Sequence, residues 1–320
     1  MPNNLINKII SFTAIIFLSG GCIPFSKETP KDNLPDTVSI TLPESSRHFV
    51  NRFPENYAGP SDDSEFFNVN QYEIDFNQEK TVVFEHGKHT FKIPHVSSIT
   101  AYEDGSHNPF LGVDEFDMFS DLGKSSNVSD EEARQNFYNL IRQMHQAGWT
   151  DLISRSAPRI KHDRKNAAAF FEVENSRIKA KPITGIPTAI ELTPEEWKKL
   201  PNLAQIGTLY AEGVLVEFML GKDNSEQYRD QYGNGQYALQ ITVKAYWDFL
   251  RLHVQEEFSK PGYREALDKE LRLRAKERKK MEDEARAEGF EIDESYQDPR
   301  PLQNSPKSPK FPPRHLGDFS

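Results

Sequence analysis

Alternating apolar and polar positions predict a β-meander in residues 70–102. In residues 71–76 the two kinds of side chain alternate with a period of two, and further strand-like runs lie on either side of residues 86–89. Because Gly87 occupies the first central position of that connection, the pattern favours a tight type II′ hairpin turn. Residues 96–101 continue the meander.

Residues 129–147 have the pattern of an amphipathic helix. Ser129 is a favourable N-cap, and Glu132, three positions later, is expected to complete a capping box. Gly148 is typical of the residue that ends a helix, and Trp149 is expected to return to the core. The apolar side chains recur at helical spacing: Ala133, Phe137, Leu140, Ile141 and Met144.

The second half of the chain predicts a short helix and two long strands. Thr193 and Pro194 begin the helix with a cap and a proline at the first helical position. Residues 209–220 and 237–247 predict the strands, and the polar residues 221–235 connect them. In the later strand the inward positions are Tyr237, Leu239, Ile241 and Val243.

These elements predict an α+β fold, in which an antiparallel sheet and a packed helix form a single domain at residues 46–260. Residues 261–288 predict a highly charged helix, beginning at Tyr263. Residues 289–320 contain repeated prolines and few apolar side chains, which indicates a disordered tail.

Residues 1–21 have the three parts of a secretory signal peptide. Lys8 supplies one positive charge, residues 9–18 form an apolar run, and small residues fill positions 19–21 before Cys22. The apolar run has about ten residues, whereas a membrane-spanning helix needs roughly 20. The alternative is an ordinary signal peptide or an apolar N-terminal helix, in which Cys22 has no special role.

The sequence around Cys22 resembles the lipobox of bacterial lipoprotein signal peptides. The resemblance implies that the chain is cut before Cys22 and that this residue, the only cysteine, carries the lipid. The position three residues before it is Ser19 rather than the more common leucine, which lies at Leu18. Ile23 after the cysteine implies sorting to the outer membrane, facing the periplasm. Residues 22–45 then form a polar tether.

The charge of the chain is acidic, with 39 basic and 49 acidic side chains and a net charge of −10. This balance disfavours nucleic acid as a partner and favours a cationic one. A single cysteine excludes an intramolecular disulfide and a thiolate metal site. The sequence also lacks the common nucleophile, zinc-protease and phosphate-loop motifs.

Three histidines form a candidate metal group. In a tight hairpin, His86 and His89 are expected to face each other, with Glu85 or His95 as a third ligand. The alternative is that these side chains are solvated turn residues, with no metal bound.

Acidic residues crowd the stretch 103–121, which contains glycine, asparagine and proline and predicts a loop. Its carboxylates are candidates for calcium binding, for a paired acid and base, or for docking a basic protein surface. The alternative is a solvated acidic loop. The candidate partner-binding residues are Asp104, Asp114, Glu115, Asp117 and Asp121.

The charged helix has a thin apolar stripe among many basic residues. Either its first turns pack on the domain while the rest is solvated, or it binds a partner or anionic headgroups. The stripe consists of Leu267, Leu271, Ala275 and Met281.

The plan of the whole chain resembles the lipid-anchored immunity proteins that neutralise type VI secretion effectors, such as antibacterial lipases, in the periplasm. The resemblance implies a non-catalytic protein that binds a partner protein and has no cofactor. Two alternatives come from other classes of protein. One is an envelope-assembly scaffold, and the other is a lipid-anchored hydrolase that uses the carboxylates of residues 103–121.

Overall fold

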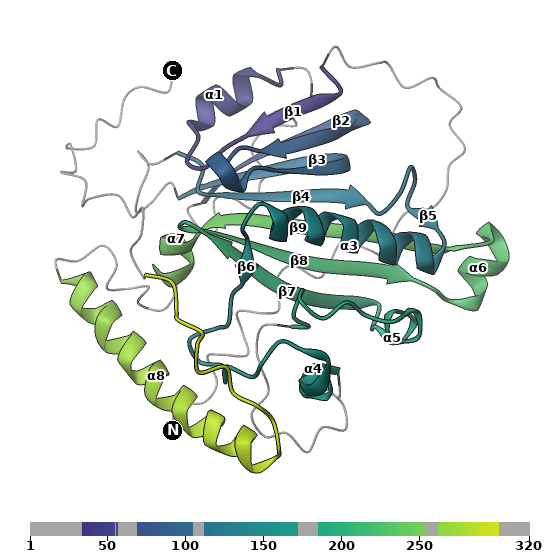
Figure 1. Ribbon diagram of the computed structural model, residues 1–320. Helices are drawn as coiled ribbons and strands as arrows, with labels where there is room; N and C mark the ends of the chain where they lie inside the picture. The colour runs from purple at the N-terminus through teal and green to yellow at the C-terminus, as the bar shows by residue number, and fades with distance from the viewer. Residues whose placement is uncertain are drawn as a thin grey trace. The chain divides into compact units, whose positions relative to one another are not determined.

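The computed structural model divides the chain into two compact units, Met1–Lys31 and Asp32–Ser320. The described residues all belong to the second unit (Figure 1). The predicted signal peptide, Cys22, the first part of the tether and the tail beyond residue 300 lie outside them. The structure describes residues 34–54, 56, 69–104, 112–171, 185–251, 254 and 262–300.

Nine strands of the described residues form one sheet, with the spatial order β1-β2-β3-β4-β9-β8-β7-β6 and β5 beside β9. Neighbouring strands are antiparallel except for the parallel pair β1 and β2. The strands are β1 (Thr37–Ile40), β2 (Val69–Phe84), β3 (Phe91–Asp104), β4 (Glu115–Asp121), β5 (Asn127–Val128), β6 (Thr150–Asp151), β7 (Leu203–Ala211), β8 (Val214–Asp223) and β9 (Gly235–Ala245).

Helices accompany this sheet, and the α+β fold class predicted from the sequence is confirmed. Helix α3 lies across one face of the sheet (Figure 1). The helices are α1 (Ser46–Asn51), α3 (Asp130–Gln146), α4 (Ala168–Phe171), α5 (Pro194–Lys199), α6 (Glu226–Tyr232), α7 (Tyr246–Arg251) and α8 (Tyr263–Ala287), with two short 3₁₀ turns, η2 (Gly87–His89) and η3 (Arg164–Asn166).

The main core lies between α3 and the sheet. The predicted stripe of α3 is buried, with Phe137 and Met144 fully enclosed. Ser129 caps the helix by accepting a hydrogen bond from the Glu132 amide at 3.2 Å. Trp149 turns back into the core, where its Nε1 donates to the His89 carbonyl at 2.7 Å. On the sheet side, the predicted inward positions of β9 are fully buried: Tyr237, Leu239, Ile241 and Val243.

One predicted turn and one predicted strand differ from the structure. The β2–β3 hairpin forms as predicted, but η2 joins its strands in place of a type II′ turn, so the prediction of the turn was wrong. Residues 209–220 are not one strand. Glu212 and Gly213, with φ of 38° and 90°, form a tight turn between β7 and β8. Continuous apolar spacing concealed this turn, because both strands of the hairpin face the same core.

The folded domain extends beyond both predicted boundaries. Residues 37–40, assigned to the tether, form β1 and pair with β2. Residues 289–300, assigned to the disordered tail, pack on the domain, where Ile292 pairs with Ile160 and is 8% exposed. The few apolar side chains of these segments are enough to hold them in place, because each packs on a surface that the rest of the domain has already formed.

No helix of the described residues is both long enough and apolar enough to cross a membrane.

The packing of residues 289–300 predicts a stability effect. Replacing Ile292→Ala removes the side chain that fills the cluster with Ile160 and Ala285, and we expect it to lower the free energy of unfolding by about 2 kcal/mol. Urea denaturation measures the change. The exposed Gln297→Ala in the same segment serves as the control. Equal stability of the two variants would contradict the packing of this segment.

Candidate functional site

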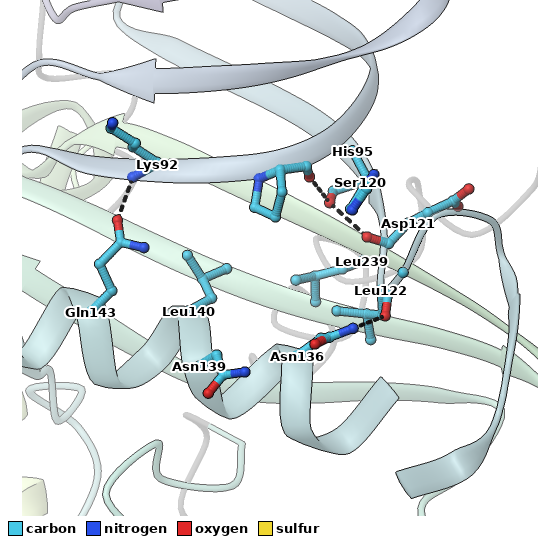
Figure 2. Close-up of a pocket in the computed structure, with 12 residues that line it drawn as sticks. Lys92, His95, Ser120, Asp121, Leu122, Asn136, Asn139, Leu140, Gln143 and Leu239 are labelled. Carbon is cyan, nitrogen blue, oxygen red and sulfur yellow. Dashed lines mark hydrogen bonds between the residues drawn. The ribbon is translucent and has the colours of Figure 1, made fainter. Parts of the chain in front are cut away.

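A pocket with a volume of about 190 Å³ opens between α3 and the ends of β3 and β4 (Figure 2). We call it the α3–β4 pocket. Its floor is apolar and its walls are polar, so it offers one small apolar chamber with hydrogen-bonding groups around it. The lining residues are Lys92, Pro94, His95, Ser120, Asp121, Leu122, Gly123, Asn136, Asn139, Leu140, Gln143 and Leu239.

The pocket lies where two strands lose their regular pairing. The β2–β3 register shifts between Asp75 and Lys80, and the β3–β4 register shifts between Val96 and Ser98. His95 adopts a φ of 55°, a left-handed conformation that costs a non-glycine residue about 1 kcal/mol or more. Bulges and strained residues of this kind are concentrated at functional sites.

Three adjacent strands bring a histidine and two carboxyl groups to the rim of the pocket. Nδ1 of His95 lies 2.8 Å from Oε2 of Glu79. Burial and then the neighbouring Glu79 carboxylate raise the pKa of Asp121 to about 6. The side chain of Asp121 extends away from α3 (Figure 2). Asp121 therefore keeps its carboxyl proton up to a higher pH than an ordinary aspartate does.

Helix α3 forms the opposite wall with amide side chains. Oε1 of Gln143 accepts a hydrogen bond from the Lys92 amide at 2.7 Å, and Nδ2 of Asn136 donates to the Leu122 carbonyl at 2.8 Å (Figure 2). The first bond ties the helix to β3 and the second ties it to the residue after β4, and each fixes one end of an amide. The other end of each amide group has no protein partner in the described part of the chain and can bind a ligand.

The three predicted histidines do not meet. His86 and His89 do lie close, with ring centroids 5.8 Å apart. Their ring nitrogens bond to main-chain carbonyls instead, Nε2 of His86 to Ala211 at 3.1 Å and Nδ1 of His89 to Ala147 at 2.7 Å. His95 pairs with Glu79 at the pocket. Among the described residues, no group of three or more histidine, cysteine or acidic side chains is arranged to hold a metal ion.

The predicted acidic loop is largely not a loop. Residues 115–121 form β4, in the middle of the sheet, and Asp114 and Asp117 are only 5% and 6% exposed. Asp104 ends β3. The prediction of a loop was wrong for residues 115–121, because pairing with β3 and β9 satisfies their main chain; the carboxylates of Asp114 and Asp117 are buried rather than solvated.

Glu115 and Asp117 belong to a polar network on the sheet face opposite α3. Asp117 accepts hydrogen bonds from Tyr102 at 3.3 Å, from Gln240 at 3.2 Å and from Thr242. Nζ of Lys244 lies 2.9 Å from Glu217 and 3.8 Å from Glu115. One lysine thus bridges carboxylates from the two strands that flank β9.

Burial changes the acidity of this network. Desolvation raises the pKa of Glu115 to about 7 against the opposing charge of Lys244, and desolvation followed by the charge of Glu115 raises the pKa of Asp248 to about 7. Burial and then Asp248 raise the pKa of Asp114 well above its usual range. Perturbed carboxyl groups of this kind are candidates for acid–base chemistry. Of the predicted acidic residues, however, Asp121 is the one that lines the α3–β4 pocket.

A second polar group, absent from the sequence predictions, surrounds Asp151. Its carboxylate accepts hydrogen bonds from the Thr188 hydroxyl at 2.5 Å and the Thr188 amide at 3.1 Å, and it lies 3.0 Å from Nδ1 of His162. Burial opposes ionisation, but these bonds hold the pKa of Asp151 below its usual value. Because both carboxylate oxygens of Asp151 are already hydrogen-bonded within the protein, we assign this group a structural role: it holds residues 188–189 against β6. No motif signals it, since its members are far apart in sequence.

No family model, curated protein or solved structure matches the chain.

The network predicts a pH dependence of stability. Unfolded carboxyl groups titrate near a pKa of about 4, so between about pH 4 and 7 the folded chain holds more protons at Glu115 and Asp248 than the unfolded chain. Their contribution to the free energy of unfolding therefore falls as the pH rises from about 4 to about 7 and is lost above that. We expect the double variant Glu115→Gln/Asp248→Asn to lose less thermal stability than the parent between pH 5.5 and 8.

Calorimetric melting midpoints at several pH values measure this difference. Glu131→Gln is the control, because hydrogen bonds from Arg134 and Gln135 lower the pKa of Glu131 to about 2, outside the window. His86, whose pKa is lowered chiefly by burial, acts in the opposite direction and is unchanged in all the proteins compared. Equal pH slopes in the double variant and the parent would contradict the raised pKa values.

Proposed function

We propose that the chain is a lipid-anchored envelope protein that binds a partner protein, and that it acts as an immunity protein against a type VI secretion effector such as an antibacterial lipase. The observation that carries the proposal is the apolar run that leads through Ser19, Gly20 and Gly21 directly to the only cysteine, Cys22. Acylation there anchors the chain at the outer membrane, facing the periplasm, where such an effector acts.

The charge of the chain supports a cationic partner. With a net charge of −10, the protein attracts a basic effector and increases the rate of their encounter. An inhibitor needs rigidity rather than catalytic groups, and a rigid surface loses little conformational entropy on binding.

The α3–β4 pocket is the docking point that we propose on the domain. A dry cavity of about 150 Å³ accepts a benzene molecule, so 190 Å³ is enough for one apolar or aromatic side chain of a partner. Asp121 and Glu79 at the rim then pair with a basic residue beside it. A buried anchor surrounded by polar contacts is typical of the energetic centre of a protein interface.

A lipid-anchored hydrolase is the second candidate function. The observation that favours it is Asp121, whose pKa of about 6 suits a general acid and which lines a pocket together with His95. Asp121→Asn separates the two functions. A hydrolase loses turnover in this variant, whereas a binding protein only loses affinity.

Acylation of Cys22 is the first prediction of this proposal. We expect the chain produced in a bacterial host to incorporate an alkyne-labelled fatty acid and to fractionate with membranes, because the thiol is the attachment point. Cys22→Ala is expected to lose both properties, and Ser26→Ala, four residues further on, to retain them. Labelling of the Cys22→Ala protein would contradict the anchor.

Protection from sister cells is the second prediction. We expect a strain without the chain to lose viability only in contact with sister cells that have an active type VI apparatus, and the restored chain to rescue it.

With the effector identified, Asp121→Asn is expected to weaken binding about two- to fivefold, as removal of one rim charge does. Calorimetry measures this loss, with the exposed Asp75→Asn as control.

Two outcomes of the survival experiment with sister cells would contradict the proposed immunity function. Equal survival with and without attackers excludes a protective role. Envelope defects in the strain grown alone would instead support the assembly scaffold.

A further inference from the structure

The inward face of α8 is fixed to the domain at both ends. Leu267 and Leu271 pack in a small apolar cluster that contains Tyr246, and Ala285 packs in another with Ile292. These contacts set the rotation of the helix about its own axis. The opposite face is therefore held toward solvent.

Buried ion pairs strengthen this attachment in the last half of α8. The Arg278 guanidinium donates two hydrogen bonds of 2.9 Å to the Asp298 carboxylate and one of 2.7 Å to the Ser154 carbonyl. Glu282, 3% exposed, accepts a hydrogen bond of 2.6 Å from Arg159. The charges that point inward are thus paired, and those that point outward form a separate set.

The outward face of α8 carries a continuous basic stripe. Its members recur at spacings of three, four and seven residues, which places them on one side of the helix. All are exposed, and Leu273 among them is 51% exposed. Over the same span the acidic residues lie beside this face: Glu270 pairs with Arg274 at 2.9 Å, and the exposed Glu277 lies one turn after Leu273. The basic stripe consists of Lys269, Arg272, Lys276, Lys279 and Lys280.

The positive charge of the stripe is opposite in sign to the net charge of the whole chain. The stripe spans twelve residues of helix, a rise of about 16 Å from the first to the last, so five basic groups occupy a short line. Arg272 pairs with Asp268 at 2.8 Å, whereas the four lysines make no ion pair in the described part of the chain. A line of unpaired cations on a convex helix attracts an extended anionic surface.

We infer that the basic stripe of α8 lies on anionic lipid headgroups, with Leu273 at the boundary between headgroups and acyl chains. Four of the five basic residues are lysines, which act as point charges and lack the planar fork with which arginine recognises individual carboxylates. Diffuse attraction of this kind fits a membrane surface, and an apolar side chain within a basic face adds shallow insertion.

This inference rests on the proposed function for the source of the lipid. A chain anchored through Cys22 keeps its domain at a high effective concentration next to the membrane, so weak attraction by the stripe is enough to bind. The contact would hold α8 against the membrane and fix the orientation of the domain. The acidic remainder of the surface would then face the periplasm and the partner.

Vesicle co-sedimentation tests the inference without the lipid anchor. The three apolar clusters lie entirely between Val38 and Ile292, so a chain that starts at residue 23 retains every core residue. We expect it to bind phosphatidylcholine vesicles that contain 30% phosphatidylglycerol at about 50 mM salt, to bind them less at about 300 mM, and not to bind pure phosphatidylcholine. Because this chain has no acyl group, the result does not depend on whether Cys22 is lipidated.

Charge reversal on the stripe identifies the binding face. We expect Lys269→Glu/Lys276→Glu/Lys280→Glu to lower the partition coefficient at least tenfold, because each basic group near an anionic surface contributes about fivefold. The matched control reverses three exposed lysines elsewhere: Lys124→Glu, Lys198→Glu and Lys199→Glu. Circular dichroism verifies that both variants are folded.

Three results would overturn the inference. The first is equal binding to neutral and anionic vesicles, and the second is an equal loss in the stripe variant and the control. The third is binding to immobilised poly-L-glutamate without binding to vesicles, which would assign the stripe to an acidic protein.

Discussion

The packing of α3 on one face of the sheet is the contact on which the other features depend. It buries Phe137 and Met144 in the main core, where the ring of Phe137 meets Phe218 of β8, and that burial fixes which way the side chains of the central strands point. Because strand side chains alternate, a carboxylate next to a buried apolar residue on β4 must project from the opposite face. The polar network around Lys244 is therefore a consequence of the apolar core.

The α3–β4 pocket arises where this regular packing is interrupted. The register shifts in β2 and β3 and the left-handed conformation of His95 lie beside this pocket, and hydrogen bonds of Asn136 and Gln143 link α3 to its other wall. The same interruption brings Glu79 next to Asp121. One irregularity of the sheet thus produces both the chamber and its acidic rim.

The C-terminal elements give the domain a second, differently charged side. Helix α8 is attached through small apolar clusters and through the Arg278–Asp298 pair, and residues 289–300 pack beside it (Figure 1). A chain that is acidic as a whole thereby presents basic groups on one helix. In the function that we propose, this division separates the side toward the membrane from the side toward the partner.

The sequence by itself determined the elements whose signals are local: α3 with its cap at Ser129, α5, α8, the β2–β3 hairpin and the inward positions of β9. Such signals need only neighbouring residues. The sequence also contains Cys22, which lies outside the described residues. Tertiary structure alone decided that Asp114 and Asp117 are buried, that residues 289–300 are packed, and that Asp121 meets Glu79 and His95. These outcomes depend on contacts between residues far apart in the chain, and no local pattern of apolar and polar positions encodes which strands become neighbours.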